Sequence, residues 1–371
     1  MAGALDLLRH AHANPGVTRA EAAAALGLSS GSATEIMGRL RAARLLGEVA
    51  APSTGRGRPT TVLVAHPQGP LVAVAELTHA TWRVTTAAIG GELAPAAVHR
   101  HSGGPPRAVL ARIRAALDAL CAQHGDRVVA VGVSVPGTVR GTTVVQAATL
   151  EWRDVDLAVL APGRPLTVGN DASLAGVAEA LRGAARGHPV ALHLTVEVGV
   201  GGVLLVGGVP ALGATGAGGE FGHVPFGDPD LHCPCGARGC WDVTVDGRAM
   251  ARSLGRPAPA DPRAFAGEVL AAARSGDRAA RAAVAQAASA LGRGVGALLN
   301  ALDPSVVTLG GLGPDLLASE HFPASVLQAA MVWRRTALPP IVPAELGARG
   351  PSIGAAESAL AAVLPTLATR R

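Results

Sequence analysis

Apolar and polar residues follow two different periods along most of this chain. Short valine-rich runs at 71–75, 128–133 and 306–309 predict buried β-strands. Longer segments rich in alanine, leucine and arginine at 107–122 and 278–301 predict amphipathic helices. Because strands and helices alternate in sequence, we expect an α/β fold with parallel or mixed sheets.

Residues 1–66 have a different pattern, which predicts short helices followed by a small hairpin. Thr18 and Glu21 have the spacing of a capping box at the start of one helix, and Gly27 ends that helix. A second helix begins near Ser29 or Ser30. Two short helices joined by a tight glycine turn are typical of a helix-turn-helix that enters the major groove of DNA.

The second of these helices has an apolar face and a polar face. We expect Ile36, Leu40 and Ala33 to point inward, which leaves the polar residues outward. A hairpin tip at 55–59 adds arginines between glycines, a pattern suited to phosphates or to a narrow minor groove. The candidate DNA contacts are Ser30, Ser32, Thr34, Glu35, Arg39, Arg56 and Arg58.

The hairpin of segments 45–49 and 61–64 has the position of a wing after the two helices. Residues 1–68 contain seven arginines and four acidic residues, so this part holds much of the net charge of +5. The alternative interpretation is a helical adaptor whose arginine-rich turn is simply solvated. The turn-rich segment 67–70 then forms a linker to the rest of the chain.

Length and composition limit the class of protein. A chain of 371 residues with 49% hydrophobic and 16% charged residues predicts two or three globular domains and excludes disorder. Every cationic side chain is arginine, since the sequence has no lysine. The uncharged stretch 198–219 contains nine glycines and a proline, which argue against a membrane-spanning helix. The N-terminus has no secretory signal, so we expect a cytoplasmic protein.

Three of the four cysteines lie within eight residues, separated by glycines. Three thiolates and one imidazole form a closed tetrahedral set that suits a structural Zn²⁺. His232 is a competing imidazole but is adjacent to a cysteine, and unligated free thiols are a further alternative. Cys121 lies on an apolar helix and is expected to be an ordinary buried thiol. The expected ligands are His223, Cys233, Cys235 and Cys240.

A series of glycine-rich motifs accompanies this cysteine cluster. In chain order they are Pro136-Gly137, Asn170-Asp171, Gly199-Val-Gly201-Gly202, Gly213, Gly219-Glu220-Phe221-Gly222-His223, Cys233-x-Cys235-Gly-x-x-Gly-Cys240, Leu309-Gly310-Gly311 and Ile353-Gly354-Ala355-Ala356. The series resembles the ROK family (repressors, open reading frames and sugar kinases) over about residues 70–365.

The resemblance implies an actin-like (ribonuclease H-like), two-lobed α/β domain with a sugar in the cleft between its lobes. It would span residues 71–371, contain the zinc motif at 223–240, and follow a winged helix-turn-helix domain at 1–66. The resemblance also implies the sugar contacts, which are Asn170, Asp171, Glu220, His223 and Asp242.

Two of the implied sugar contacts need comment. The residue that matches Asp171 is the general base of the family's kinases, but Asp171 also suits the N-cap of a helix at 172–181. Asp242 stands where the family usually has glutamate, and its shorter side chain changes which hydroxyl it reaches or leaves a gap for water.

The family's phosphate loops distinguish a kinase from a sensor. Its kinases have a Gly-Gly pair and a Thr where this chain has Leu77-Thr78-His79-Ala80, and a Thr where it has Val198 after Glu197. Side chains and a negative charge therefore stand where backbone N–H groups would approach ATP phosphates. We expect no kinase activity, with Asp171 a vestigial base.

The expected function is a sugar-responsive transcriptional repressor that binds double-stranded operator DNA as a homodimer or higher homo-oligomer. One alternative is an ATP-dependent carbohydrate kinase with a DNA-binding extension. Another is a zinc-stabilised scaffold whose cleft binds no ligand.

Overall fold

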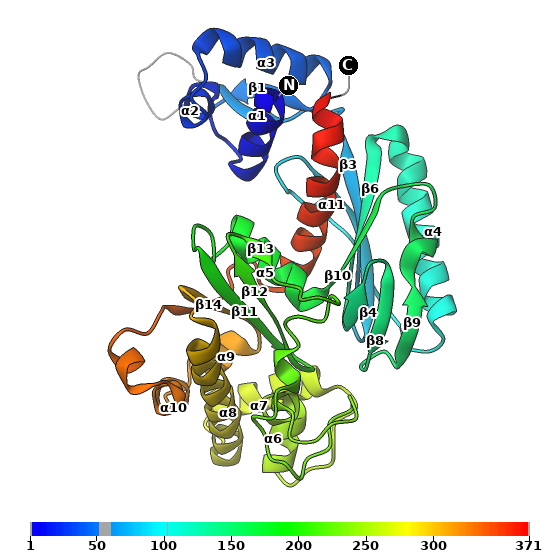
Figure 1. The fold of residues 1–371 in the computed structure, drawn as a ribbon. Helices are drawn as coiled ribbons and strands as arrows, with labels where there is room; N and C mark the ends of the chain where they lie inside the picture. Colours follow the sequence, from blue (N-terminus) through cyan, green and yellow to red (C-terminus); the bar gives the residue numbers. More distant parts are fainter. Residues whose placement is uncertain (1, 52–60, 102, 370–371) are drawn as a thin grey trace.

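The computed structural model describes residues 2–51, 61–101 and 103–369, which form three parts (Figure 1). A small N-terminal module lies at one end of the molecule. Two lobes follow, each built on a five-stranded sheet. The mixed strand directions in both sheets confirm the α/β architecture that the sequence predicts.

The N-terminal module contains the predicted short helices and hairpin. Thr18 caps its helix, and the reciprocal bonds of the capping box with Glu21 are present. The two strands pair antiparallel, with Leu46 opposite Ala65, but the expected hairpin tip, including Arg56 and Arg58, lies outside the described residues. The elements are α1 (Ala2–Ala13), α2 (Arg19–Ala25), α3 (Ser30–Ala42), β1 (Leu46–Ala50) and β2 (Thr61–Ala65).

Helix α3 has the expected inward and outward faces, with one difference. Ala33, Met37 and Leu40 are buried, whereas Ile36 is half-buried at the edge of the same face. Met37 therefore occupies the central inward position that the sequence pattern gave to Ile36. Ser29 is the N-cap, and its side chain accepts a hydrogen bond from the Ser32 N–H group.

The first lobe is a sheet in the order β10-β6-β3-β4-β5. Its strands β3, β6 and β10 run parallel, β4 pairs antiparallel with β3, and β5 pairs antiparallel with β4. Helix α4 (Pro106–His124) packs on one face, and α11 (Gly350–Thr369) packs on the other. The strands are β3 (Leu71–Leu77), β4 (Thr81–Ala88), β5 (Val98–Arg100), β6 (Val128–Val135) and β10 (Leu166–Asn170), with a small sheet of β7 (Thr138–Arg140), β8 (Thr143–Ala147) and β9 (Trp152–Asp156) beside them.

The second lobe is a sheet in the order β13-β12-β11-β14-β15. One face packs on α5 (Asp171–Arg182), and the other packs on a larger helical layer that includes the long helix α8. The strands are β11 (Val190–Glu197), β12 (Gly199–Val206), β13 (Val209–Pro210), β14 (Val306–Gly311) and β15 (Ile341–Pro343), and the helices are α6 (Gly247–Ser253), α7 (Pro262–Arg274), α8 (Arg278–Leu302), α9 (Gly313–Leu317) and α10 (His321–Ala329).

Helices α5 and α11 lie between the two sheets (Figure 1). Their backbones touch, because a Cβ atom built on Gly354 of α11 would overlap the carbonyl oxygen of Leu174 in α5. Helix α11 also presents Leu360 and Leu364 to Leu7 and Leu8 of α1. The N-terminal module and the first lobe therefore share one apolar core.

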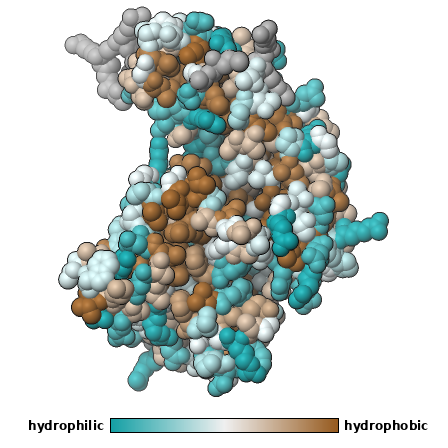
Figure 2. All heavy atoms as spheres, in the orientation of Figure 1, coloured by the Kyte–Doolittle hydropathy of each residue, from teal (hydrophilic) through white to brown (hydrophobic). Residues whose placement is uncertain are grey.

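Two regions of the surface and core are notably apolar. Figure 2 shows apolar side chains gathered over β12 and β13, where Val206, Val209 and Leu212 are exposed.

Helix α8 and the segment 347–369 are long and apolar enough to cross a membrane by length and composition alone. In each, 61% of the apolar window is buried inside the fold, as in the core helices of a globular domain. The stretch 198–219 forms strands instead.

The contact between α5 and α11 predicts that Gly354→Ala destabilises the fold, because its methyl group has no room beside the Leu174 carbonyl. We expect the free energy of unfolding to fall by about 1–3 kcal/mol. Urea denaturation measures it. Gly267→Ala is the matched control, since no atom lies within 4 Å of its added methyl group on α7, and it should stabilise by about 0.5–1 kcal/mol. Equal behaviour of the two variants would contradict the tight contact.

Candidate functional site

The candidate site is a cleft of about 600 Å³ between the two lobes. The cleft is lined by residues at or directly after the carboxyl ends of four strands, which are β3, β6, β10 and β14. Open α/β sheets commonly bind ligands outside the carboxyl ends of their strands. The cleft is lined by the candidate sugar contacts and by the turns after β3 and β11.

Strand β10 ends at the cleft and leads directly into helix α5. Asn170 is the N-cap, because its side-chain oxygen accepts a hydrogen bond from Ser173 N–H at 3.0 Å. Its amide nitrogen donates to the Gly137 carbonyl at 3.1 Å. The alternative that Asp171 caps a helix at 172–181 is therefore wrong: Asp171 is the first helical residue, and its carboxylate faces the cleft.

Asp171 lies in an electrostatically unfavourable place for a carboxylate. Burial raises the pKa of Asp171 to about 7. The hydrogen bond from Ala172 N–H opposes this shift, and the charges of Glu197 and Glu76 add to it. Burial also raises the pKa of Glu197, although its ion pair with Arg263 opposes that shift. The cleft therefore strongly disfavours additional negative charge.

Loops of the second lobe bring Glu220, His223 and Asp242 to the same cleft as Asn170 and Asp171. Glu220 accepts a hydrogen bond from the Thr138 hydroxyl of the first lobe at 2.6 Å. Asp242 accepts one from Val200 N–H at 2.6 Å, which fixes the start of β12. Thus all five of the predicted sugar contacts line one cleft.

The four expected metal ligands form a cluster whose donor atoms all lie within 4.8 Å of one another. The Sγ atoms of Cys235 and Cys240 are 3.7 Å apart, and Cys233 Sγ is 3.8 Å from His223 Nδ1. Two sulfurs on a tetrahedral zinc ion are separated by about 3.8 Å, given a Zn–S bond of about 2.3 Å. The donor set therefore fits a Zn²⁺ ion with four protein ligands, and it does not include His232.

His223 belongs to both the cluster and the cleft. Its Nδ1 faces Cys233, while its Nε2 lies 3.8 Å from a carboxylate oxygen of Glu220. A metal bound to Nδ1 would fix the ring and leave Nε2 directed at the cleft. Cys121 is half-buried and packs on the apolar core of the first lobe, away from this cluster.

The turns after β3 and β11 carry ion pairs in this cleft that the sequence did not predict. Glu197 pairs with Arg263 of α7 at 2.6 Å, and His79 lies 3.6 Å from Asp261. The latter contact joins the turn after β3 in the first lobe to α7 in the second. Asp261 is the N-cap of α7, so the Asp-Pro pair at 261–262 could have predicted the start of this helix from the sequence. No local sequence pattern relates Asp261 to His79.

The turn after β3 is also closed on itself. The Thr78 hydroxyl bonds to Thr81, and the Glu76 carboxylate accepts hydrogen bonds from Arg83, at 2.7 Å, and from Ser352. These polar groups are consequently directed to protein partners. The backbone of this turn is covered by its own side chains, unlike a glycine-rich phosphate loop.

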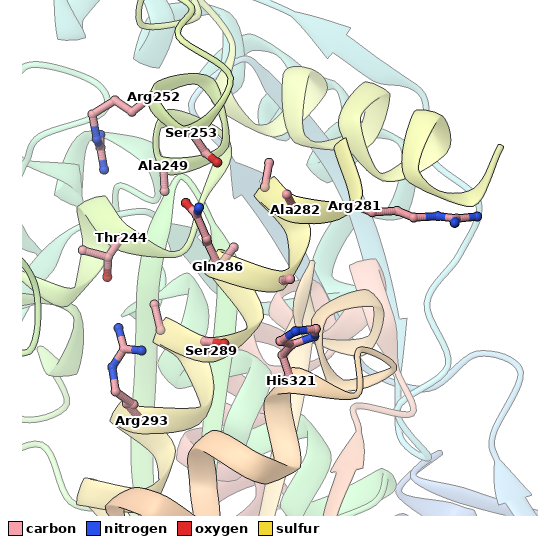
Figure 3. Close-up of a pocket in the computed structure, with 14 residues that line it drawn as sticks. Thr244, Ala249, Arg252, Ser253, Arg281, Ala282, Gln286, Ser289, Arg293 and His321 are labelled. Carbon is pink, nitrogen blue, oxygen red and sulfur yellow. The ribbon is translucent and has the colours of Figure 1, made fainter. Parts of the chain in front are cut away.

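A second hollow lies on the far side of the second lobe, between α6, α8 and α10, and has a volume of about 830 Å³. Figure 3 shows Gln286 and Ser289 at its centre, with Arg281 extending away from them. Its floor consists largely of alanines, and no acidic residue lines it. Because this hollow is more open than the interlobe cleft, the cleft is the better candidate for a ligand site.

The candidate DNA-contact residues on α3 are Ser30, Ser32, Thr34, Glu35 and Arg39. All five are exposed. The Thr34 hydroxyl donates to the Ser30 carbonyl within the helix, and Ser32 shares a hydrogen bond with the capping Ser29. The side chains of Glu35 and Arg39 extend from the outer face of the helix. This face is thus available to a partner.

The family model of the ROK family matches residues 85–362. The chain belongs to the ROK family. The glucokinase of Streptomyces coelicolor is 31% identical over 228 residues, covering 56% of this chain and 71% of the glucokinase. The xylose repressor of Bacillus subtilis is 28% identical over 130 residues, or 34% of each chain.

A crystal structure of a ROK family transcriptional regulator, described as a homolog of the E. coli MLC protein, is similar over 99% of this chain and 98% of its own. The TM-score is 0.77 at 22% sequence identity, so this likeness concerns the fold. The two lobes have the actin-like fold of ROK sugar kinases. Both kinases and repressors are relatives of this ROK protein.

The metal cluster predicts that Cys235→Ser removes bound zinc, because three remaining ligands no longer close the tetrahedron. Elemental analysis of the purified full chain measures the metal content. Cys121→Ser is the control and should keep the zinc content of the natural sequence. A full equivalent of zinc in Cys235→Ser would contradict the ligand set.

The raised pKa of Asp171 predicts a pH-dependent effect of Asp171→Asn on stability. The folded state binds a proton at this site up to about pH 7, whereas the unfolded chain loses it near pH 4. This group therefore stabilises the fold at low pH and loses that contribution as pH rises to 7. Relative to the natural sequence, Asp171→Asn should gain about 1–3 kcal/mol between pH 5 and pH 8 in urea denaturation. A constant difference would refute the assigned pKa.

Proposed function

We propose that this ROK protein is a sugar-responsive, DNA-binding transcriptional repressor of the cytoplasm. In this proposal, residues 1–66 form a winged helix-turn-helix domain, 67–70 a linker and 71–371 the sugar-binding domain. A structural Zn²⁺ is held by the 223–240 motif, and a homodimer places two α3 helices on a two-fold operator.

The proposed sugar site uses one amide, three carboxylates and one imidazole. Asn170, Asp171, Glu220, His223 and Asp242 all line the cleft, and such groups bind several hydroxyls in fixed directions. Because Asp242 is committed through one oxygen to Val200 N–H, its other oxygen is the one available to a sugar hydroxyl. The names of the relatives, a glucokinase and a xylose repressor, support a monosaccharide ligand.

The observation that favours a regulator over a kinase is that ion pairs occupy the turns after β3 and β11, which match the phosphate loops of the family's kinases. Glu197 and Arg263 pair there, and the His79–Asp261 contact bridges the lobes. Arg263, a cation that lines the cleft, is therefore already bound to a carboxylate of the protein instead of being free for a phosphate. A sugar carries no charge and needs no such cation.

The proposed DNA interface rests on α3 and on charge. Ser30, Ser32, Thr34, Glu35 and Arg39 are exposed on α3, and Arg56 and Arg58 stand in the sequence between the two strands of the hairpin. Arginine-rich segments that neutralise phosphates make binding dependent on salt. The xylose repressor among the relatives supports this part of the proposal.

One observation favours the alternative of a carbohydrate kinase. A carboxylate with a pKa of about 7 is poised to accept a proton from a sugar hydroxyl at neutral pH, and the glucokinase relative is 31% identical. The two functions differ in whether ATP is consumed.

The proposed function is tested by measuring DNA affinity with and without sugar. A duplex selected from a random pool by the full-length, zinc-loaded chain serves as the probe in fluorescence anisotropy. We expect D-glucose, D-xylose or N-acetyl-D-glucosamine to change the Kd for DNA by about 5- to 150-fold, since allosteric couplings commonly have this size. Glu220→Gln should lose the sugar response but keep DNA binding.

Glu268→Gln, on the exposed face of α7, is the matched control and should respond as the natural sequence does. Sugar-dependent ADP release from MgATP that disappears in Asp171→Asn would instead show a kinase. Absence of any sugar effect on both melting temperature and DNA affinity would favour a scaffold with an inactive cleft, because a ligand of the native state must stabilise it.

A further inference from the structure

The C-terminal end of α1 contacts the two lobes through a buried polar junction. His12 and Glu357 are 7% and 4% exposed, and His12 Nε2 lies 2.6 Å from a Glu357 carboxylate oxygen. The other oxygen of Glu357 accepts a hydrogen bond from Arg182 Nε at 2.9 Å. One residue each from α1, α11 and α5 therefore meets at this point.

The hydrogen bonds fix the state of His12. Gly90 N–H donates to His12 Nδ1 at 2.8 Å, so Nδ1 is an acceptor and Nε2 carries the proton donated to Glu357. Burial raises the pKa of Glu357, but the bonds from His12 and Arg182 outweigh it and hold that pKa below its usual value. The junction thus brings together the Glu357 carboxylate, the His12 imidazole and the Arg182 guanidinium.

The same helix that enters this junction begins in the ligand cleft. Asn170 and Asp171 stand at the start of α5, and Arg182 is its last residue. Eleven residue steps correspond to about 16 Å along a helix. Just beyond the helix, Arg186 donates to the side-chain oxygen of Asn14 at 2.6 Å and to the Ala13 carbonyl. Both arginines reach from the far end of α5 to the end of α1.

The two sides of the junction are attached to different lobes. Helix α1 shares the apolar core of the first lobe through α11, whereas α5 packs on the second sheet through Val177 against Val203 and Leu205. The Nη1 atom of Arg182 is buried and has no hydrogen-bond partner within residues 2–51, 61–101 and 103–369. An unsatisfied buried donor costs free energy, so a position of α5 that gives this nitrogen a partner gains stability. A small shift of α5 can therefore exchange the hydrogen bonds of Arg182 at this junction.

We propose that Arg182 and Arg186 are positioning residues, through which occupation of the cleft sets the orientation of the N-terminal module. This inference rests on the proposed function and names the contacts that regulate it. The ligand acts on the start of α5, the rigid helix carries the displacement, and the two arginines transfer it to His12, Ala13 and Asn14.

The test uses the full-length chain and the variant Arg182→Gln/Arg186→Gln, which keeps the His12–Glu357 bond and cuts only the ties from α5. Hydrogen–deuterium exchange of residues 2–14 is measured with and without saturating sugar, and sugar Kd by calorimetry. We expect sugar to change exchange in this segment of the natural sequence about fivefold or more. In the double variant that change should disappear, while sugar Kd stays within about threefold.

Arg127→Gln is the matched control, because Arg127 ties the first lobe to the Gly69 and Pro67 carbonyls without involving α5. It should keep the full sugar response. Arg182→Lys tests the guanidinium itself, since lysine retains the charge but not the fork, and it should lose part of the response. Melting temperatures of all variants check that they fold.

The outcomes separate this inference from the proposed function. If no sugar binds the natural sequence, the proposed function fails. If sugar binds but the double variant keeps its response in residues 2–14, or Arg127→Gln loses as much, the arginines do not transmit the signal. A response lost only in variants of Arg182 and Arg186 would support the inference.

Discussion

The direct backbone contact between α5 and α11 is the constraint on which the rest of this structure depends. Gly354 and Gly350 of α11 leave room only for Leu174 and Ala175 of α5, so the two helices cross without side chains between them. Each helix also packs on one sheet, so their contact fixes how far apart the sheets stand. The width of the cleft follows from this contact, and so does the position of Asn170 and Asp171 at its rim.

A second constraint operates on the loops that complete the cleft. Phe221, Phe226 and Trp241 anchor the two ends of the segment 220–242 in the core of the second lobe, while the part between them packs on a small cluster around Cys233 and Cys240. That small cluster buries little surface for a loop of this length, whereas four ligands to one ion remove many of its conformations. A bound Zn²⁺ would therefore position Glu220 and Asp242 indirectly, because both flank the ligands His223 and Cys240 in sequence.

Local signals in the sequence predicted much of the fold, whereas the residues of the cleft followed from the resemblance to the ROK family. The capping box at Thr18, the valine-rich strands and the cysteine spacing depend on residues close in sequence, and the structure contains them. The sequence could not show whether Asn170 or Asp171 is the N-cap of α5, because both residue types cap helices. The ion pairs of Glu197 with Arg263 and of His12 with Glu357 join residues far apart in sequence, so no local pattern indicates them.

The raised pKa of Asp171 needs a physical interpretation that does not assume catalysis. Its causes are burial and two neighbouring carboxylates, Glu197 and Glu76. In a kinase, an ATP-bound cation would offset the negative charge of such groups, but here protein cations already serve that purpose, since Arg263 binds Glu197 and Arg83 binds Glu76. The two carboxylates that raise the pKa of Asp171 are thus each paired with an arginine of the protein. Burial and these neighbours account for the shift, so the raised pKa does not by itself require a catalytic role for Asp171.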